Sequence, residues 1–345
     1  QEGDQGFMEL LSREFGIHPI ISQILMSRDL LDIEDARRYL KPSLNDLHNP
    51  FLMQDMNKAV ERLIRALHRH EKIMIYGDYD ADGITSVVVL LKFLRQITDS
   101  AGYYIPDRIS EGYGLNTGAV DRMHSEGVGL IVTVDCGISD HEQIAHAQRL
   151  GIDTIILDHH ELSETLPAAV AVVNPNRKDC RFPFKPLAAV GIVFNFLIAL
   201  RGELRREGFW KDGRYPNLRE YLDLVALGTI GDIAPLVDEN RILARIGLEL
   251  MTEDRRTGIT ALKKVAGIEN QAIDSCKASF CLIPRINAAG RIASAREAVE
   301  LLLSDNPDEA EELAKRLDGF NRKRQAMEKA IFSELVEQVG DPDDS

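Results

Sequence analysis

The residues Ile73-Met74-Ile75-Tyr76-Gly77-Asp78-Tyr79-Asp80-Ala81-Asp82-Gly83 decide the fold of this 345-residue chain. Residues 73–76 form a short apolar run, typical of a buried strand. Three aspartates at alternate positions follow in a polar turn, and the apolar stretch 84–97 has the length of a helix. Since open α/β sheets bind their ligands at the carboxyl ends of strands, we expect the three carboxylates to face a binding site.

Strand-like and helix-like segments alternate beyond this turn. The sequence predicts strands near 102–105 and at 130–134, 154–157 and 169–173, with helices near 117–126 and between Ser139 or Asp140 and Gly151. Strands separated by helices of this length indicate an α/β fold, in which a parallel sheet has helices on both faces.

The flanking segments are mostly helical. Apolar residues recur at helical spacing over 7–15, 59–67, 187–204, 218–227 and 241–251, and a last helix is expected from 307 to about 339. We therefore predict three parts. These are an N-terminal helical extension over 1–70, an α/β domain over 71–305 that becomes mostly helical from about 187, and a connecting helix with an acidic tail over 306–345.

Composition narrows the class of protein. Hydrophobic residues make up 44% of the chain, yet no apolar run reaches the roughly 20 residues of a membrane span. The four cysteines form no CxxC pair, which predicts a reducing, cytoplasmic location. The net charge of −14 argues against a nucleic-acid partner, although a cluster of metal-binding carboxylates makes a chain look more acidic than its working site.

Two later strands also end in side chains that can bind metal. Asp135 follows the strand at 130–134, and Asp158-His159-His160 follow the strand at 154–157. Each has a plainer explanation when taken alone, because single aspartates cap helices and histidines at strand ends are often structural. Three strands that all end in this way are hard to explain by independent structural roles. Asp232, at the end of a later apolar helix, is a weaker candidate for the same cluster.

The turn at 78–83 also matches the start of a calcium-binding EF-hand loop. Such a loop needs a bidentate acid at its twelfth position, which is Val89 here, and a helix rather than a strand before it. The calcium interpretation therefore fails. Carboxylates with one or two imidazoles favour manganese or magnesium, and they can hold two ions about 3.5–4 Å apart around a bridging water. Such a centre suits hydrolysis of a phosphate ester.

These segments carry a family resemblance. Residues 77–83, Asp135, Asp158-His159-His160 and 228–232 resemble the ordered motifs of the DHH phosphoesterase family. Residues 284–291, 105–108 with 111–114, 36–42 and 49–50 are similar to segments of its RecJ branch. The resemblance covers about residues 10–335. It implies a divalent-metal-dependent 5′→3′ exonuclease that acts on single-stranded DNA in recombination and repair.

The resemblance also implies roles for individual residues. The implied ligands of two Mn²⁺ or Mg²⁺ ions are Asp80, Asp82, Asp135, His159 and Asp232, with Asp135 between the ions and Asp78 as a further ligand or an outer partner. The implied catalytic set is Asp135, Asp158, His159 and His160, where His160 contacts the scissile phosphate and Asp158 orients His159. The implied DNA contacts are His160, Arg108, Arg285, Asn287 and Arg291, since guanidinium groups bind phosphate in a bidentate way.

The implied partners are single-stranded DNA and, on the protein side, a single-strand-binding protein or a helicase. In the RecJ branch a long helix leads to a second domain of the DHHA1 type, which contains a glycine- and histidine-rich motif. The present sequence ends with that helix, so we expect a fragment that lacks the second domain and cuts weakly.

Two other functions compete with this one. A DHH phosphoesterase could act on short oligoribonucleotides, cyclic dinucleotides or pyrophosphate, but the N-terminal helices and the segment Asn287-Ala288-Ala289-Gly290-Arg291 favour the RecJ branch. A non-catalytic DHH scaffold is the second alternative. We would expect such a scaffold to lose ligands, and every ligand position here has a competent side chain.

Overall fold

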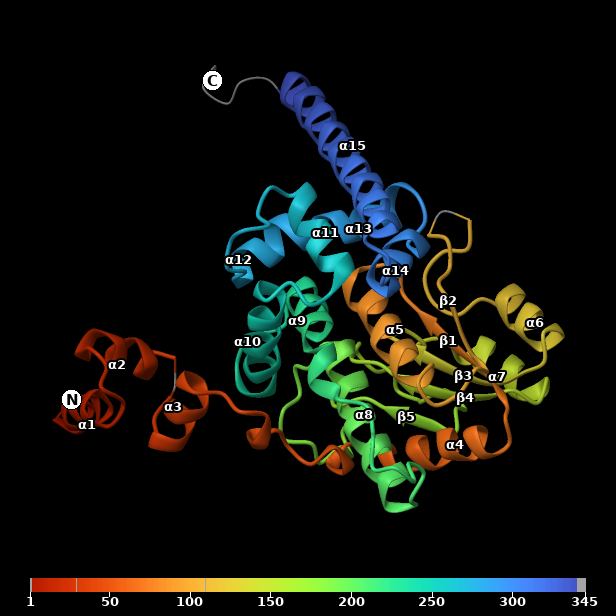
Figure 1. The fold of residues 1–345 in the computed structure, drawn as a ribbon, viewed down its shortest axis with the longest axis horizontal. Helices are drawn as coiled ribbons and strands as arrows, with labels where there is room; N and C mark the ends of the chain where they lie inside the picture. The colour runs from red at the N-terminus through yellow and green to blue at the C-terminus, as the bar shows by residue number, and fades with distance from the viewer. Residues whose placement is uncertain (1, 29, 109, 340–345) are drawn as a thin grey trace.

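The computed structural model describes residues 2–28, 30–108 and 110–339, with side chains described from residue 5 to residue 336 within these ranges. In this part of the chain the central sheet has five parallel strands in the order β2-β1-β3-β4-β5 (Figure 1). The strands are β1 (Lys72–Gly77), β2 (Ala101–Tyr104), β3 (Val128–Val134), β4 (Asp153–Leu157) and β5 (Ala171–Val173). The predicted α/β fold with a parallel sheet is confirmed.

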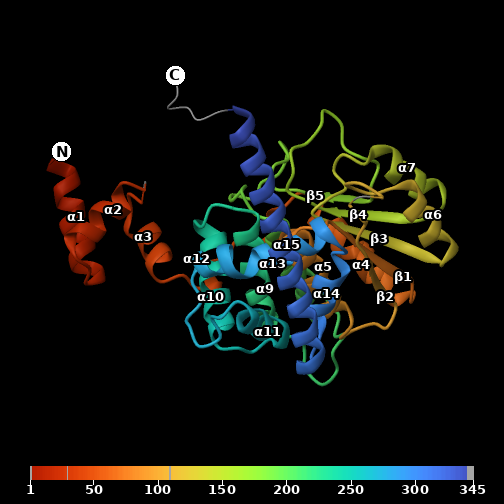
Figure 2. The ribbon, with the colours of Figure 1, turned by 90° about the horizontal axis from the view of Figure 1, so that it is seen from above.

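Alternate residues of each strand enter two separate cores. Ile73 and Ile75 of β1 belong to one buried cluster, whereas Met74 and Tyr76 belong to the other. The first core includes residues of α4 (Met56–His68), α5 (Ala81–Leu94) and α8 (Ala189–Arg206). The second includes residues of α6 (Thr117–Ser125) and α7 (His141–Arg149), which lie together beside the sheet in Figure 2. The sheet is therefore buried on both faces, as parallel sheets usually are.

A mostly helical part follows α8. It comprises η3 (Leu218–Tyr221), α9 (Leu222–Gly231), α10 (Asp238–Thr252), α11 (Thr257–Val265), α12 (Ser275–Lys277), the π-helical turn η4 (Ala278–Leu282), α13 (Ile283–Ile292) and α14 (Arg296–Leu303). The long helix α15 (Pro307–Val339) packs against α11, α13 and α14, and its second half extends away from the body (Figure 1).

The N-terminal helices lie to one side of this body. They are α1 (Glu2–Phe15), α2 (Pro19–Met26) and α3 (Ile33–Leu40), and the short turns η1 (Leu44–Asp46) and η2 (Pro50–Leu52) lead from them to the body (Figures 1 and 2). In contrast, α4 contributes residues to the same core as the sheet. The domain boundaries near residues 70 and 305 stay predictions. Within the described residues, the structure contains no helix both long enough and apolar enough to span a bilayer.

Two helix starts show why local side chains matter. α5 begins at Ala81, earlier than the predicted residue 84, because Asp80 caps it and accepts hydrogen bonds from the N–H groups of residues 82 and 83 at 2.9 and 3.1 Å. α7 begins directly after Asp140, as predicted. The Asp140 carboxylate makes no capping bond, however, and accepts a hydrogen bond from Leu115 N at 2.7 Å instead.

Candidate metal centre

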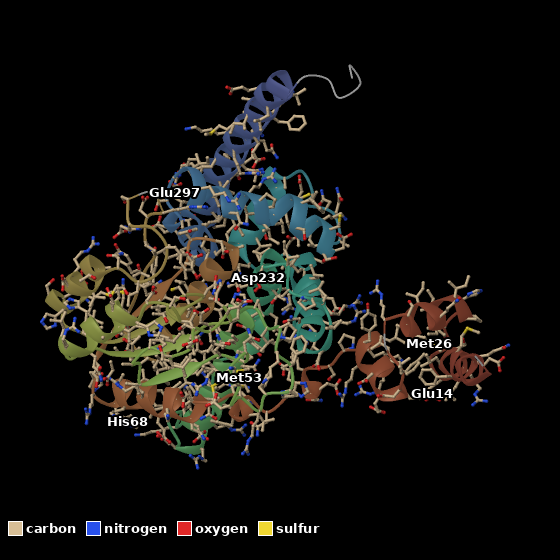
Figure 3. All side chains as sticks on the ribbon, turned by 180° about the vertical axis from the view of Figure 1, so that it is seen from behind. Glu14, Met26, Met53, His68, Asp232 and Glu297 are labelled. Atoms are coloured by element: carbon tan, nitrogen blue, oxygen red, sulfur yellow. The ribbon has the colours of Figure 1, made fainter. Side chains whose placement is uncertain are left out.

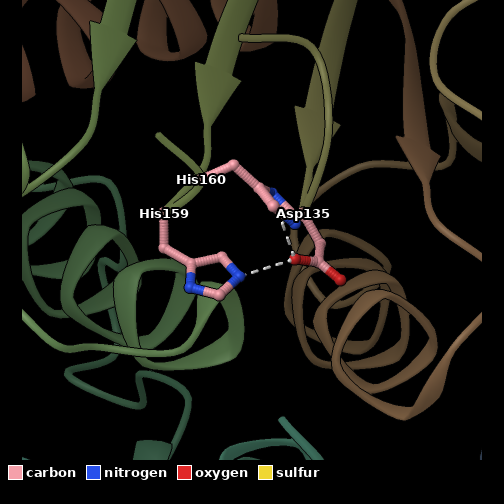
Figure 4. A group of neighbouring side chains, drawn as sticks. All are labelled: Asp135, His159 and His160. Carbon is pink, nitrogen blue, oxygen red and sulfur yellow. Dashed lines mark ion pairs between the residues drawn. The ribbon is translucent and has the colours of Figure 1, made fainter. Parts of the chain in front are cut away.

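Three neighbouring strands bring the predicted acids and histidines together. β1, β3 and β4 are adjacent in the sheet, and their carboxyl ends lead to Asp78, Asp135 and Asp158. Because parallel strands end at the same edge, residues about eighty positions apart meet there. Figure 4 shows Asp135 with His159 and His160 beyond the ends of these strands.

The turn after β1 is held in place by two close contacts. A Cβ at position 83 would lie 2.6 Å from Asp78 O, so the tight return of the chain requires Gly83. Asn287, from the distant helix α13, accepts a hydrogen bond from Ala81 N at 2.8 Å. The resemblance implied a DNA contact for Asn287. In this structure its amide oxygen fixes the turn that carries Asp80 and the other acids.

Asp82 joins this turn to α8. Its two carboxylate oxygens accept hydrogen bonds from Ala189 N at 2.7 Å and Val190 N at 2.9 Å, at the start of that helix. Backbone N–H groups at a helix N-terminus are free to bind an anion, so the buried carboxylate is well supported there.

Asp232 reaches the cluster because α9 packs very closely on α5. A Cβ at Gly228 would lie 2.2 Å from Thr85 Oγ1 and 3.0 Å from Asp82 Oδ1, so only glycine permits this approach. Asp232 follows at the C-terminal end of α9 (Figure 3). The weakest of the predicted ligand positions therefore lies beside Asp82.

Asp135 has a strained backbone. Its φ of 61° lies in the left-handed region, which residues other than glycine rarely adopt. The backbone is anchored on both sides, since Asp135 N donates to Leu157 O at 3.1 Å and the Tyr113 hydroxyl donates to Asp135 O at 3.3 Å. Strain of this kind persists where surrounding contacts enforce it, and it is common at functional sites.

His159 lies at the centre of the cluster. Its Nε2 is 3.2 Å from Asp135 Oδ1 and 4.0 Å from Asp82 Oδ2, while its Nδ1 is 3.7 Å from Asp232 Oδ2. Burial lowers the pKa of His159, and the neighbouring His160 lowers it further. The ring is therefore held neutral, which is the form that binds metal.

His160 makes a different pair. Its Nδ1 lies 2.7 Å from Asp158 Oδ1, and this hydrogen bond raises the pKa of His160 despite partial burial. Burial alone would raise the pKa of Asp158, but hydrogen bonds from His160 and from the backbone lower it below its usual range. The sequence predicted that Asp158 orients the His159 ring, and the structure corrects this: the ring that it binds belongs to His160.

The remaining carboxylates are crowded and poorly hydrated. Burial, followed by repulsion from Asp80, raises the pKa of Asp78 to about 7 and that of Asp232 to about 6. Burial and then neighbouring carboxylates raise the pKa of Asp82 and Asp135 well above their usual range. Such a cluster is unfavourable when fully ionised, unless a cation balances its charge.

The donor atoms fit divalent cations. Three overlapping groups of side chains could each hold an ion, because within each group the ligand atoms lie within 4.8 Å of one another. The groups are Asp78 with Asp80 and Asp135; Asp82 with His159 and Asp232; and Asp135 with His159 and His160. Buried polar atoms are nearly always hydrogen-bonded, yet Asp78 Oδ1, Asp135 Oδ1 and His159 Nε2 make no hydrogen bond. Neighbouring ligands of an octahedral ion with bonds of about 2.1 Å lie about 3 Å apart, close to the 3.2 Å between the last two atoms.

The predicted DNA-contacting arginines differ in their surroundings. The Arg108 guanidinium lies over the Tyr79 ring, 5.0 Å from its centroid. Its positive charge lowers the pKa of Asp78, against the effect of burial, so Arg108 lies near the cluster of acids. Arg291 is exposed and has no hydrogen bond or ion pair within the described residues. Arg285 is mostly buried and forms an ion pair with Asp318 of α15 at 2.8 Å. Its guanidinium is thus already occupied inside the protein.

Sequence reasoning missed two asparagines that hold the histidine loop. Asn174 Nδ2 donates to His160 O at 3.0 Å, and Asn176 Nδ2 donates to His159 O at 2.6 Å. Both follow β5, so the fourth strand of the sheet edge also ends in polar residues that serve this site. The segment Asn174-Pro175-Asn176 directly after an apolar strand was a signal that could have identified them.

An open parallel sheet with carboxylates and a neutral imidazole gathered at its carboxyl edge defines a metal-binding α/β protein. Residues 72–229 match the model of the DHH family, N-terminal domain. The chain is 41% identical, over 98% of its length, to the single-stranded-DNA-specific exonuclease RecJ of Bacillus subtilis, covering 42% of that protein. It is 42% identical, over 92% of its length, to the Escherichia coli protein of the same name, covering 55% of it.

Solved structures give the same result. A crystal structure of exonuclease RecJ bound to manganese matches 87% of this chain with 33% identity and a TM-score of 0.75, and the chain covers 73% of that structure. RecJ from Thermus thermophilus in complex with Mn²⁺ matches 98% of the chain with 30% identity and a TM-score of 0.82, with 47% of that structure covered. The chain therefore belongs to the RecJ branch of the DHH family. It spans about half the length of the curated relatives that it matches.

Proposed function

We propose that this chain hydrolyses phosphodiester bonds of single-stranded DNA as a 5′→3′ exonuclease in recombination and repair, with two Mn²⁺ or Mg²⁺ ions. The observation that carries the proposal is the set of buried oxygen and nitrogen atoms of Asp78, Asp135 and His159 that make no hydrogen bond at the edge of the sheet. The names of the relatives support the substrate, and relatives with bound manganese or magnesium support the metal.

In the proposed site the ions would be held by Asp78, Asp80, Asp82, Asp135, His159 and Asp232, and Asp135 belongs to two of the three ligand groups. When bound, divalent ions would activate a water molecule and stabilise charge on the attacking and leaving oxygens. The protein supplies the orientation. His159 is held neutral by burial, and the Asp135 backbone is fixed by Leu157 and Tyr113.

The proposed role of the His160–Asp158 pair is to bind the scissile phosphate. A hydrogen bond to Asp158 favours the charged form of His160, and the His160 ring is about half exposed. A cationic imidazole can donate a hydrogen bond to a phosphate oxygen and stabilise its negative charge. The Arg108 guanidinium stacks on the ring of Tyr79, which belongs to the acidic turn, and we propose that it holds a further phosphate.

Two further assignments belong to the proposal. The four cysteines lie unpaired in the structure, and few scattered thiols suit a cytoplasmic location. A single-strand-binding protein or a helicase is proposed as a partner from the family resemblance alone.

A degradation assay tests the function. Single strands labelled at the 5′ or the 3′ end, a matched duplex and a dinucleotide are each incubated with the protein and Mn²⁺. We expect loss of the 5′ label first, on single strands only, and no hydrolysis by Asp80→Ala, Asp135→Ala or Asp232→Ala. Preferred hydrolysis of the dinucleotide would favour the small-substrate alternative, and no hydrolysis of any substrate would favour the scaffold alternative.

A further inference from the structure

A second recess adjoins the metal centre and contains none of its proposed ligands. This cavity of about 460 Å³ lies between the end of α9, η4, α13 and α15, and its walls include Ile233, Phe280, Pro284, Asn287 and Arg291. Its volume falls within the range of small-ligand sites, about 300–1,000 Å³. Ile233 directly follows Asp232, and Asn287 holds the acidic turn through Ala81, so two walls of the cavity are continuous with the centre.

Ile233 has a left-handed backbone conformation that is unfavourable for a β-branched residue. It closes α9 through hydrogen bonds from Ile233 N to Ile230 O and from Ala234 N to Thr229 O, with a φ of 59°. Glycine normally occupies this left-handed position, and a β-branched residue there is strained. The side chain is 89% exposed, so burial offsets little of that strain. The position thus holds an apolar side chain at the cavity mouth against the local backbone preference.

Phe280 supplies a second exposed apolar surface. It is 76% exposed and lies in η4, which is a π-helical turn. Such turns are rare and occur frequently at functional sites. Exposed aromatic rings in a recess are a common means by which proteins bind unpaired bases, because every base has a face on which it can stack.

Arg291 gives this apolar recess a positive charge. Its guanidinium has no hydrogen bond or ion pair among the described residues, whereas the nearby Arg324 is engaged by Asn321 and Glu328. Gly290, directly before Arg291, packs on the acidic turn, because a Cβ at this position would lie 2.3 Å from Tyr79 O. An apolar surface can contact a nucleobase, and the neighbouring Arg291 guanidinium can bind the phosphate of the same strand.

We propose that this recess, the Ile233–Phe280 pocket, binds one nucleobase of a single strand whose neighbouring phosphate lies at the metal centre. The base contacts Phe280 and Ile233, and Arg291 binds the phosphate that follows it. This proposal rests on the proposed function. It implies that the site recognises a nucleobase in addition to the sugar-phosphate backbone.

The test compares single strands in which one nucleotide at a time, counted from the labelled end, is replaced by an abasic nucleotide. Initial rates with Mn²⁺ give kcat and KM for the parent protein, Phe280→Ala, Ile233→Gly and the control Phe332→Ala. Phe332 is 68% exposed on α15, so the control removes an exposed ring elsewhere. Thermal unfolding of each variant shows whether it is folded, and Ile233→Gly is expected to unfold no lower than the parent because glycine accepts the positive φ.

We expect one abasic position to lower kcat/KM of the parent and of Phe332→Ala by about tenfold, mainly through KM. In Phe280→Ala and Ile233→Gly the same position should cost less than about threefold, because the base contact is already lost. Equal abasic penalties in all four proteins would overturn the pocket while leaving the nuclease function intact. A parent protein that does not hydrolyse the unmodified strand would overturn the proposed function, and the pocket with it.

Discussion

Oδ1 of Asp158 lies 2.7 Å from Nδ1 of His160, and the same oxygen accepts hydrogen bonds from the backbone N–H groups of His159 and His160. The other oxygen accepts from Ile138 N at 3.1 Å. One fully buried carboxylate therefore fixes the His160 ring and the backbone of both histidines. Polar partners behind a site commonly determine how its side chains are oriented.

Asp158→Asn should lower kcat for single-stranded DNA by about 10–100-fold, the usual effect of losing such a partner. The substitution removes the charge that stabilises a cationic His160. Asp140→Asn is a suitable control, since Asp140 is another acid at this edge, and it bonds Leu115 rather than a histidine. A normal kcat for folded Asp158→Asn would show that His160 does not need this partner.

Two neighbouring acids should affect the stability of the metal-free protein in opposite directions. Asp80→Ala removes the cap of α5 and should lower the free energy of unfolding by about 1 kcal/mol. Asp78→Asn removes a charge from a buried oxygen without a hydrogen-bond partner, and should raise it. Urea denaturation in the presence of a chelator measures both. Stabilisation by Asp80→Ala would show that carboxylate repulsion outweighs the cap.

The stability that Asp78 and Asp232 contribute to the metal-free protein should fall as pH rises from about 4 to about 7. Aspartate in an unfolded chain has a pKa of about 3.9, whereas burial raises the pKa of Asp232 to about 6 and that of Asp78 to about 7. The folded state therefore holds protons that the unfolded state has lost, and this contribution to stability disappears through that window. Thermal unfolding with a chelator should show the decline, reduced in Asp78→Asn and reversed by Mn²⁺. A pH-independent difference between parent and variant would contradict these shifts.

Arg285 and Arg291 should separate into a structural and a DNA-binding role. Arg285→Ala breaks a mostly buried ion pair with Asp318 and should cost about 2 kcal/mol of stability, less than the roughly 3–5 of an isolated buried pair because Arg322 also contacts Asp318. Arg291→Ala should change stability by less than about 0.5 kcal/mol but weaken DNA binding. Urea denaturation and fluorescence anisotropy with a labelled single strand distinguish the two. If Arg285→Ala were as stable as the parent and bound DNA more weakly, the result would support the predicted DNA contact of Arg285 instead.

Much of the fold could be predicted because its signals are local. The apolar run 73–76 and the polar turn after it predicted a strand and a helix start with only small errors at the ends. The convergence of Asp78, Asp135 and His159 followed from one rule about parallel strands. These features depend on periodicity and on residue type, which a single sequence displays directly.

The rest depends on contacts between distant segments. No local pattern tells that Asp158 binds the second histidine rather than the first, or that Asn287 reaches Ala81, more than two hundred residues away. The same holds for Arg285, whose partner Asp318 lies on α15. Side chains of this kind were assigned by resemblance, and the tertiary structure places two of them in supporting positions.

Calorimetric titration with Mn²⁺ tests the central claim, that this edge of the sheet is a divalent-metal centre, most directly. The protein is first freed of metal, and the parent is compared with Asp135→Ala. We expect the parent to bind about two ions per chain with release of protons, because carboxylates with raised pKa values must ionise to become ligands. Asp135→Ala should lose at least one of these ions, since Asp135 belongs to two of the three ligand groups. Absence of Mn²⁺ binding to the folded parent, or an identical isotherm for Asp135→Ala, would contradict the account.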